Sequence, residues 1–187
     1  GRQGTIHFFV NNSATTTKTL FLDLTPHTQG YNDCGLLGIA FHPQYGMPGS
    51  TNRGYVYVSY SFSPAPVINP PYETDNYNRL SRFTVPDGSL VADPNSEVVL
   101  INQFDRNVWH NGGGMFFGHD GFLYLTNGDE GGDNDLHNQA QKINSGLFSG
   151  VLRIDVDMIP TRSHPIRRQP QSDTSPPVGW PPTYSQH

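Results

Sequence analysis

The chain has 187 residues and a formal net charge of -5, and only 14% of its residues are charged. This length is enough for one domain with a hydrophobic core. No basic run extends beyond Arg167-Arg168, which argues against a nucleic-acid partner, because phosphates require a basic face. No apolar run approaches the ~20 residues of a membrane span.

The chain is rich in turn-forming residues, with 20 Gly and 16 Pro, and this composition is typical of all-β proteins built from short strands. Alternating or β-branched and aromatic stretches predict nine strands. In chain order they are Thr5–Val10, Lys18–Leu24, Leu36–Phe41, Tyr55–Tyr60, Leu80–Val85, Glu97–Ile101, Gly113–Phe117, Phe122–Thr126 and Val151–Val156.

No amphipathic helix is evident, and Leu136–Leu147 is interpreted as a loop with at most one helical turn. The segment from Met158 to His187 is crowded with Pro and Ser and lacks strand alternation. We therefore divide the chain into residues 1–157, which carry the strands, and residues 158–187, a Pro-rich loop or tail.

Two stretches of the chain follow the same order of strands about 70 residues apart. In each, a small apolar strand is followed by a turn, an aromatic strand and an Arg-containing strand; they begin at Leu37 and Gly114. Four-stranded blades around a central channel produce such a series, with the small apolar strands on the inside. A β-sandwich with coincidental similarity is the alternative.

The first candidate for chemistry is His110, which is followed by Asn111 and three glycines. Glycines allow close approach of the backbone. At the mouth of a propeller this imidazole would suit a general base that takes a proton from an alcohol. The alternative is a surface histidine in a Gly-rich loop.

The second candidate is Asp129, in an acidic loop that follows the aromatic strand of the same repeat. Strand and turn geometry places it at the rim that carries His110, where a carboxylate can orient an imidazole. The loop could instead bind Ca²⁺ through oxygen ligands, or be a solvated acidic turn. The oxygen ligands would be Asp129, Asp133, Asn134 and Asp135.

Four further residues could have a functional or a purely structural role. Asp33 precedes the first inner strand, at the rim position equivalent to His110, where it could bond a sugar hydroxyl or act as a turn residue. His42 and His119 are interpreted as turn caps at the opposite rim. Cys34, the single cysteine, is interpreted as a packed residue and not a nucleophile.

Four motifs in this order resemble the glucose/sorbosone dehydrogenase family of pyrroloquinoline quinone (PQQ) enzymes. The resemblance extends to about Asp157, over most of the chain. The motifs are Gly35-Leu36-Leu37-Gly38-Ile39-Ala40-Phe41-His42-Pro43, His110-Asn111-Gly112-Gly113 with Gly118-His119-Asp120-Gly121, Leu123-Tyr124 with Gly128-Asp129, and Leu152-Arg153-Ile154-Asp155-Val156-Asp157.

The resemblance implies a six-bladed β-propeller with four-stranded antiparallel blades, of which this chain covers the first two to three. It implies PQQ held with the help of Ca²⁺, an aldose substrate and an external electron acceptor. His110 matches the catalytic histidine and Asp129 the aspartate that supports it. Asp33 falls where the family carries a glutamine and Trp109 where it carries an aspartate, so these two are candidate sugar contacts and the identity of the sugar stays open.

The family needs roughly twice this length, so most residues that bind PQQ are expected beyond His187. We expect the rest of the propeller to come from missing residues or another chain. An extracytoplasmic location, periplasmic or secreted, agrees with the resemblance and with the single cysteine. The alternative is a non-catalytic propeller that binds a partner, as in the hedgehog-interacting protein group, or a structural subunit of an extracellular assembly.

Overall fold

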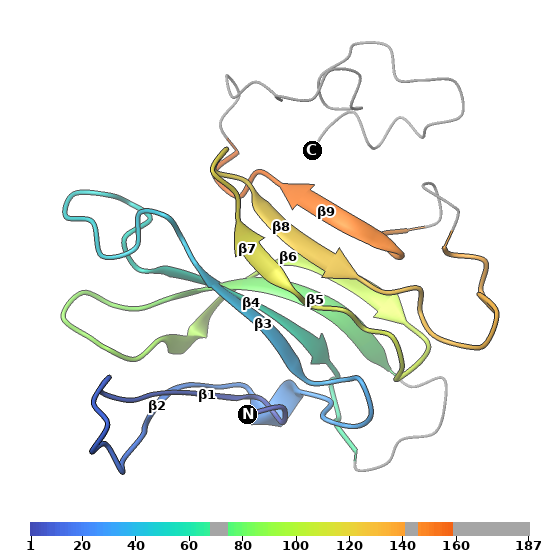
Figure 1. Ribbon diagram of the computed structural model, residues 1–187, viewed down its shortest axis with the longest axis horizontal. Helices are drawn as coiled ribbons and strands as arrows, with labels where there is room; N and C mark the ends of the chain where they lie inside the picture. Colours follow the sequence, from blue (N-terminus) through green and yellow to red (C-terminus); the bar gives the residue numbers. More distant parts are fainter. Residues whose placement is uncertain (68–74, 141–145, 159–187) are drawn as a thin grey trace.

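The computed structural model describes residues 1–67, 75–140 and 146–158, which form three antiparallel sheets (Figure 1). This part of the chain holds no α-helix and therefore none that is long and apolar enough to cross a membrane. One short 3-10 turn, η1 (Thr25–His27), was not predicted. The Pro-rich segment that was predicted as a loop or tail falls, from residue 159 onward, outside the described residues.

The central sheet has four strands in sequential order. They are β3 (Leu36–Phe41), β4 (Tyr55–Phe62), β5 (Asn76–Thr84) and β6 (Asp93–Asp105), each antiparallel to the next. An up-and-down sheet of four strands is the unit from which propellers are built.

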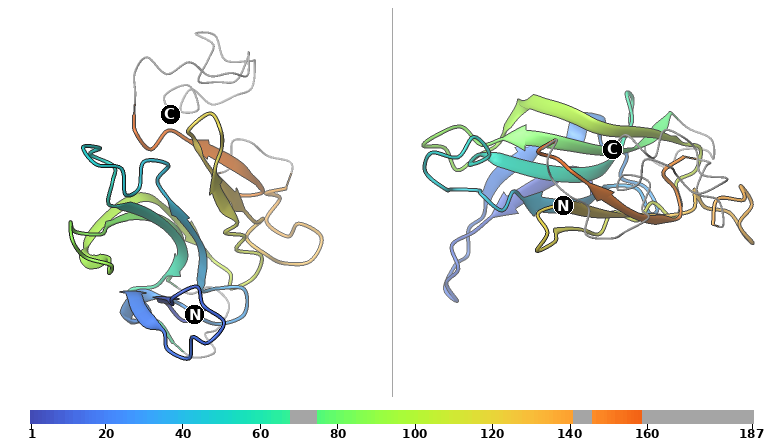
Figure 2. Two further views of the ribbon diagram at one scale, coloured as in Figure 1. Left: turned by 60° about the vertical axis from the view of Figure 1, so that its left-hand side comes forward. Right: turned by 90° about the horizontal axis from the view of Figure 1, so that it is seen from above.

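Two smaller sheets flank this blade. A ribbon of β1 (Thr5–Phe8) and β2 (Thr19–Asp23) lies on one side, and a sheet of β7 (Met115–Phe117), β8 (Leu123–Asn127) and β9 (Gly150–Ile154) lies on the other. Figure 2 shows the central sheet curving between them. The described residues therefore comprise one complete blade, three strands of the next, and a ribbon on the far side.

The hydrophobic core lies in two layers, one on each face of the central sheet. Val56, Val58 and Tyr60 of β4 pack against the β1–β2 ribbon, together with Phe21 and Leu22. Alternate side chains face the other way, so that Tyr57 and Leu80 pack against Leu123 and Leu125 of β8. Because both faces of β4 are covered, this strand is apolar or small almost throughout.

The internal repeat is confirmed: β3, β4 and β5 correspond to β7, β8 and β9. The two inner strands β3 and β7 contact each other. A Cβ on Gly38 would lie 2.2 Å from the Gly113 carbonyl oxygen, and one on Gly113, at φ +104°, would lie 2.3 Å from Leu37 Cβ. The glycines of the His110 motif thus serve the convergence of inner strands.

The main departure from the predicted strands is β6, which runs over Asp93–Asp105 where only Glu97–Ile101 was expected. It is the outermost strand of its blade, so its side chains are largely solvated and follow no clean alternation. Val98, Val99 and Leu100 are 41%, 45% and 38% exposed. Of the predicted Leu136–Leu147 loop, residues 136–140 form turns, and 141–145 lie outside the described residues.

Candidate functional site

Four predicted site residues meet at one rim of the blades, which we call the mouth rim. It is formed by the segment before β3, the loop between β6 and β7, and the loop after β8. Asp33 comes from the first, Trp109 and His110 from the second, and Asp129 from the third. The structure joins Asp33, His110 and Asp129 by hydrogen bonds, whereas Trp109 lines an adjacent hollow.

His110 and Asp129 form a hydrogen-bonded pair, with 2.7 Å between Nδ1 and Oδ1. Burial tends to raise the pKa of the Asp129 carboxyl, but hydrogen bonds from His110 and from the Gly131 amide outweigh it and hold this pKa below its ordinary value. The ionised carboxylate therefore accepts from Nδ1–H. Nε2 is left as the acceptor, on a side chain that is 53% exposed.

The backbone around His110 is held in an unusual conformation. His110 has φ +59°, in the left-handed region that costs a residue with a Cβ about 1–2 kcal/mol. The Asp33 carboxylate accepts a hydrogen bond from the His110 amide at 2.9 Å, which helps to fix this conformation. One Asp33 oxygen thus holds the His110 backbone in place, a role that was not predicted.

The loop after β8 lies directly against the His110 backbone. A Cβ on Gly128 would lie 1.5 Å from the His110 carbonyl oxygen, so only glycine fits there. A Cβ on Gly112, which has φ +75°, would similarly lie 2.8 Å from the Thr126 carbonyl oxygen. Two loops that are 18 residues apart in the chain are thereby brought close enough for Asp129 to reach the imidazole.

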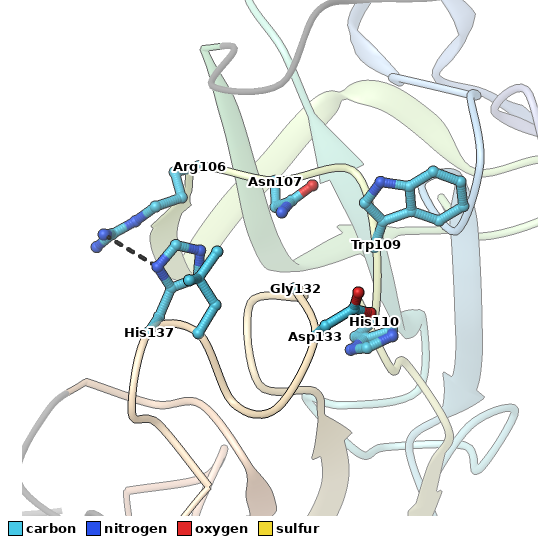
Figure 3. A pocket seen from close by; sticks show the side chains of 8 residues that line it. Arg106, Asn107, Trp109, His110, Gly132, Asp133 and His137 are labelled. Carbon is cyan, nitrogen blue, oxygen red and sulfur yellow. Dashed lines mark hydrogen bonds between the residues drawn. The ribbon is translucent and has the colours of Figure 1, made fainter.

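His110 lies between two hollows. The larger, of about 540 Å³, is open at the mouth rim (Figure 3). Its walls are Arg106, Asn107, Trp109, His110, Gly132, Asp133, Leu136 and His137. The smaller, of about 370 Å³, borders the inner strands and is lined by Arg2, Asn32, Asp33, Leu37, His110, Asn111 and Gly112. A base shared by two hollows can serve a reaction between two bound molecules.

A buried polar layer supports the loop that carries His110. Asp105, at the end of β6, is fully buried and accepts hydrogen bonds from the side chains of Asn78 and Asn111 and from the Asn107 amide. Burial raises the pKa of Asp105 to about 7 against these bonds. Because Asn111 follows His110 directly, this layer sets the position from which the imidazole extends.

The acidic loop does not gather its carboxylates at one point, and it is not simply a solvated turn. Among the described residues, no group of three or more His, Cys, Asp or Glu side chains is placed to hold a metal ion. Asp129 turns toward His110, while Asp135 accepts from the amides of Gln139 and Ala140. Glu130 is 1% exposed, so the interpretation of the loop as wholly solvated is wrong at its centre.

Cys34 is packed and His42 caps a turn, as predicted, and His42 makes one further contact. Cys34 is fully buried, and burial raises the pKa of its thiol to about 11, which agrees with its interpretation as a packed residue. His42 accepts from the Gln44 amide and so caps its turn, but its Nε2 also contacts Asp157 at 3.1 Å across the two blades. His119 is exposed in the turn after β7.

These features define a class: adjacent blades of a β-propeller with an oriented histidine between two hollows at the mouth. The family model described as Glucose / Sorbosone dehydrogenase matches residues 1–176. The chain therefore belongs to the glucose/sorbosone dehydrogenase family. The match extends past Asp157, where the motifs quoted above end.

Known proteins agree with this assignment. A PQQ-bound aldose sugar dehydrogenase from Streptomyces coelicolor superposes with a TM-score of 0.61 at 23% identity, over 89% of this chain and 43% of that one. Among curated relatives, the hedgehog-interacting protein of Mus musculus is 33% identical over 131 residues, covering 69% of this chain and 17% of its own. The HIPL2 protein of Arabidopsis thaliana is 27% identical over 168 residues, covering 78% and 24%. The chain thus spans less than half of the matched structure and a quarter or less of the curated relatives.

Proposed function

We propose that the whole protein is a PQQ-dependent sugar dehydrogenase and that this chain supplies its proton-accepting side. The observation that carries the proposal is the His110–Asp129 pair, in which Asp129 bonds Nδ1 of a half-exposed imidazole that lines two hollows. A carboxylate-oriented imidazole is the usual arrangement of a general base near neutral pH.

In the proposed reaction the aldose binds with its C1 hydroxyl beside His110. Nε2 takes the hydroxyl proton while Asp129 holds the ring through Nδ1 and stabilises the imidazolium that forms. The chemistry that bound PQQ would supply is acceptance of the hydride from C1, and the aldose would then leave as a lactone. Trp109 offers an aromatic wall on which the apolar face of a sugar ring can pack, and Asp33 keeps one carboxylate oxygen for a sugar hydroxyl.

The described residues fit part of the cofactor's needs. PQQ is a flat polyanion, so it needs a base next to its reacting edge and cations for its carboxylates. His110 meets the first need, but Arg106 is already paired with Glu130, and Arg2 at the smaller hollow is the other cation near the site among the described residues. We therefore expect most of the residues that bind PQQ, and the Ca²⁺ ligands, to lie outside the described part.

The test is aldose oxidation by the full-length protein after addition of PQQ and Ca²⁺, followed with a dye as external electron acceptor. An absorbance titration with PQQ is the parallel measurement. We expect saturable PQQ binding and turnover that requires both additions. PQQ binding without turnover on a panel of aldoses, or no binding at all, would contradict the proposal.

A second function is favoured by one comparison. The identity with the hedgehog-interacting protein is 33%, higher than the 23% with the aldose sugar dehydrogenase structure. A propeller that binds a protein partner, or a structural subunit, could use the same loops for blade closure alone. Failure to bind PQQ together with a stable, monodisperse fold favours this reading.

We further propose an extracytoplasmic location, periplasmic or secreted, and a role in carbohydrate oxidation. The remaining partners follow from the same proposal: a small sugar, an external electron acceptor, no nucleic acid and no membrane span. The rest of the propeller would come from residues outside the described part or from another chain.

A further inference from the structure

We propose that Glu130 is a positioning residue that fixes Asp129 against His110. The inference rests on the proposed function and adds to it a residue that does not itself contact the reacting atoms. In sequence Glu130 is one more acid in an acidic loop, and its role is visible only from its burial and partners.

Glu130 is a buried carboxylate with both oxygens occupied. Its side chain is 1% exposed. Oε1 accepts from Arg106 Nε at 2.9 Å and from the Arg106 amide at 3.3 Å, and Oε2 accepts from Gln139 Nε2 at 3.0 Å. An isolated buried charge is costly, and these charge-assisted bonds are what permit it to stay.

Together Arg106, Glu130 and Gln139 form a clamp across the site. Arg106 follows the end of β6 and begins the loop that carries His110, whereas Glu130 and Gln139 belong to the loop that carries Asp129. The clamp therefore ties the two halves of the His–Asp pair together at a second point. Arg106 also reaches His137 at 3.5 Å on the wall of the larger hollow (Figure 3).

The backbone that follows Asp129 is held in a constrained conformation. Glu130, Gly131 and Gly132 have φ of +69°, +73° and +91° in succession. A non-glycine residue keeps such a φ only where its surroundings enforce it. A Cβ on Gly131 would lie 3.0 Å from Trp109 Cβ, so this turn is packed on the His110 loop, and its amide bonds to Asp129 Oδ1 at 3.1 Å.

It follows that loss of the Glu130 charge should release the loop and let Asp129 leave the imidazole. The key variant is Glu130→Gln, which keeps the shape of the side chain but removes its charge. The matched control is Glu97→Gln. Glu97 likewise accepts hydrogen bonds from two other segments, from Tyr60 and Ser81 at 2.6 Å, but it lies in the middle of β6, away from the His110 loop.

The experiment uses the full-length protein with PQQ and Ca²⁺, and both glutamine variants are made in the wild type and in Asp129→Ala. We expect Glu130→Gln to lower kcat by about 10- to 100-fold with a smaller change in KM, as displacement of a catalytic group does. In Asp129→Ala it should lower kcat no further, because Glu130 acts through Asp129. Glu97→Gln should leave kcat unchanged in both backgrounds.

Two results would overturn the inference. One is an unchanged kcat in Glu130→Gln with a lowered Tm, which would make the residue merely structural. The other is a loss of kcat on Glu130→Gln that is as large in the Asp129→Ala background as in the wild type, which would mean that Glu130 acts independently of Asp129. If the wild type has no turnover, nitrogen NMR of the His110 ring decides: the fraction of rings with the proton on Nδ1 should fall in Glu130→Gln and stay unchanged in Glu97→Gln.

Discussion

Each rim of the two blades carries one His–Asp pair, and the two pairs differ in what the second ring nitrogen does. At the mouth rim, His110 Nδ1 lies 2.7 Å from Asp129, and the imidazole is 53% exposed. At the opposite rim, His42 Nε2 lies 3.1 Å from Asp157, and the imidazole is 4% exposed. The residue types are the same, but the two histidines differ in burial and in the partners of their ring nitrogens.

His42 has both nitrogens in use. Nδ1 accepts from the Gln44 amide at 3.0 Å, so Nε2 carries the proton and donates to Asp157 on the next blade. The ring also packs on Phe117, with the centroids 5.4 Å apart. His110 uses Nδ1 for Asp129, and its half-exposed imidazole lines both hollows. A histidine at hydrogen-bond distance from an aspartate is thus a candidate base only when its other nitrogen is accessible.

The largest expected effect is on turnover in His110→Ala. Removal of a general base costs about 10²- to 10⁴-fold in rate. We therefore expect kcat for aldose oxidation by the PQQ-loaded protein to fall by that factor, while Tm changes little, because the His110 side chain is half exposed. Unchanged turnover in a correctly folded His110→Ala protein would remove His110 from the mechanism.

His42→Ala is the matched control at the opposite rim and should give the reverse result. It removes a buried imidazole that joins two blades and leaves the Gln44 amide without its acceptor. We expect turnover per folded molecule to stay at the wild-type level, while the free energy of unfolding falls by about 1–3 kcal/mol in chemical denaturation. A loss of turnover as large as that of His110→Ala would erase the distinction between the two rims.

The next effect tests how tightly the mouth rim is packed. Gly128→Ala would drive a Cβ into the His110 carbonyl oxygen, 1.5 Å away, so one of the two loops has to move. We expect a loss of about 3 kcal/mol or more in stability, or a folded protein whose His110–Asp129 bond is broken, as seen by nitrogen NMR of the His110 ring.

Gly150→Ala is its control in the same blade. The nearest atom to a Cβ there is the Phe148 carbonyl oxygen at 3.9 Å, an ordinary contact, so this variant should be close to wild type in both measurements. Equal effects of the two alanines would mean that the close approach at Gly128 does not hold the site together.

Much of this arrangement could be predicted from local sequence, because the alternation of polar and apolar residues that marks a strand is visible in the sequence itself. β3 has the predicted bounds, Leu36–Phe41, and the repeat placed Asp33 and His110 at equivalent positions before inner strands. The extent of β6 could not be predicted, since the outermost strand of a blade packs on one neighbour only and follows no strict pattern.

The contacts between loops could not be predicted from the sequence either. Asp157 is 115 residues from His42, and only the docking of two blades brings them together. Glu130 looks like a solvated acid beside Asp129, and its burial depends on Arg106, which lies 24 residues away in the loop after β6. Charge composition predicts exposure unless a specific partner is known, and partners are set by tertiary structure.

The smallest expected effect is on the pH dependence of stability, for which one carboxyl group from each rim is compared. Behind the mouth rim, burial raises the pKa of Asp105 to about 7, so the folded state favours the protonated form. Stability contributed by this group is therefore present below about pH 4 and is lost as the pH rises toward 7. At the opposite rim, burial of Asp120 is outweighed by hydrogen bonds from Tyr124, the Phe122 amide and Arg153, which lower its pKa. Its contribution is present above about pH 4 and is lost in more acidic solution.

Asp105→Asn and Asp120→Asn should accordingly change the pH profile of unfolding in opposite regions. In Asp105→Asn the decline in stability between about pH 4 and 7 should shrink by ~1 kcal/mol or more, as measured by denaturant titration at several pH values. In Asp120→Asn that decline should persist, and the loss of stability below pH 4 should shrink instead. If Asp105→Asn keeps the wild-type slope between pH 4 and 7, its carboxylate is ionised in the folded protein throughout. The three N–H groups directed at it would then outweigh its burial, and the layer behind His110 would carry a fixed negative charge.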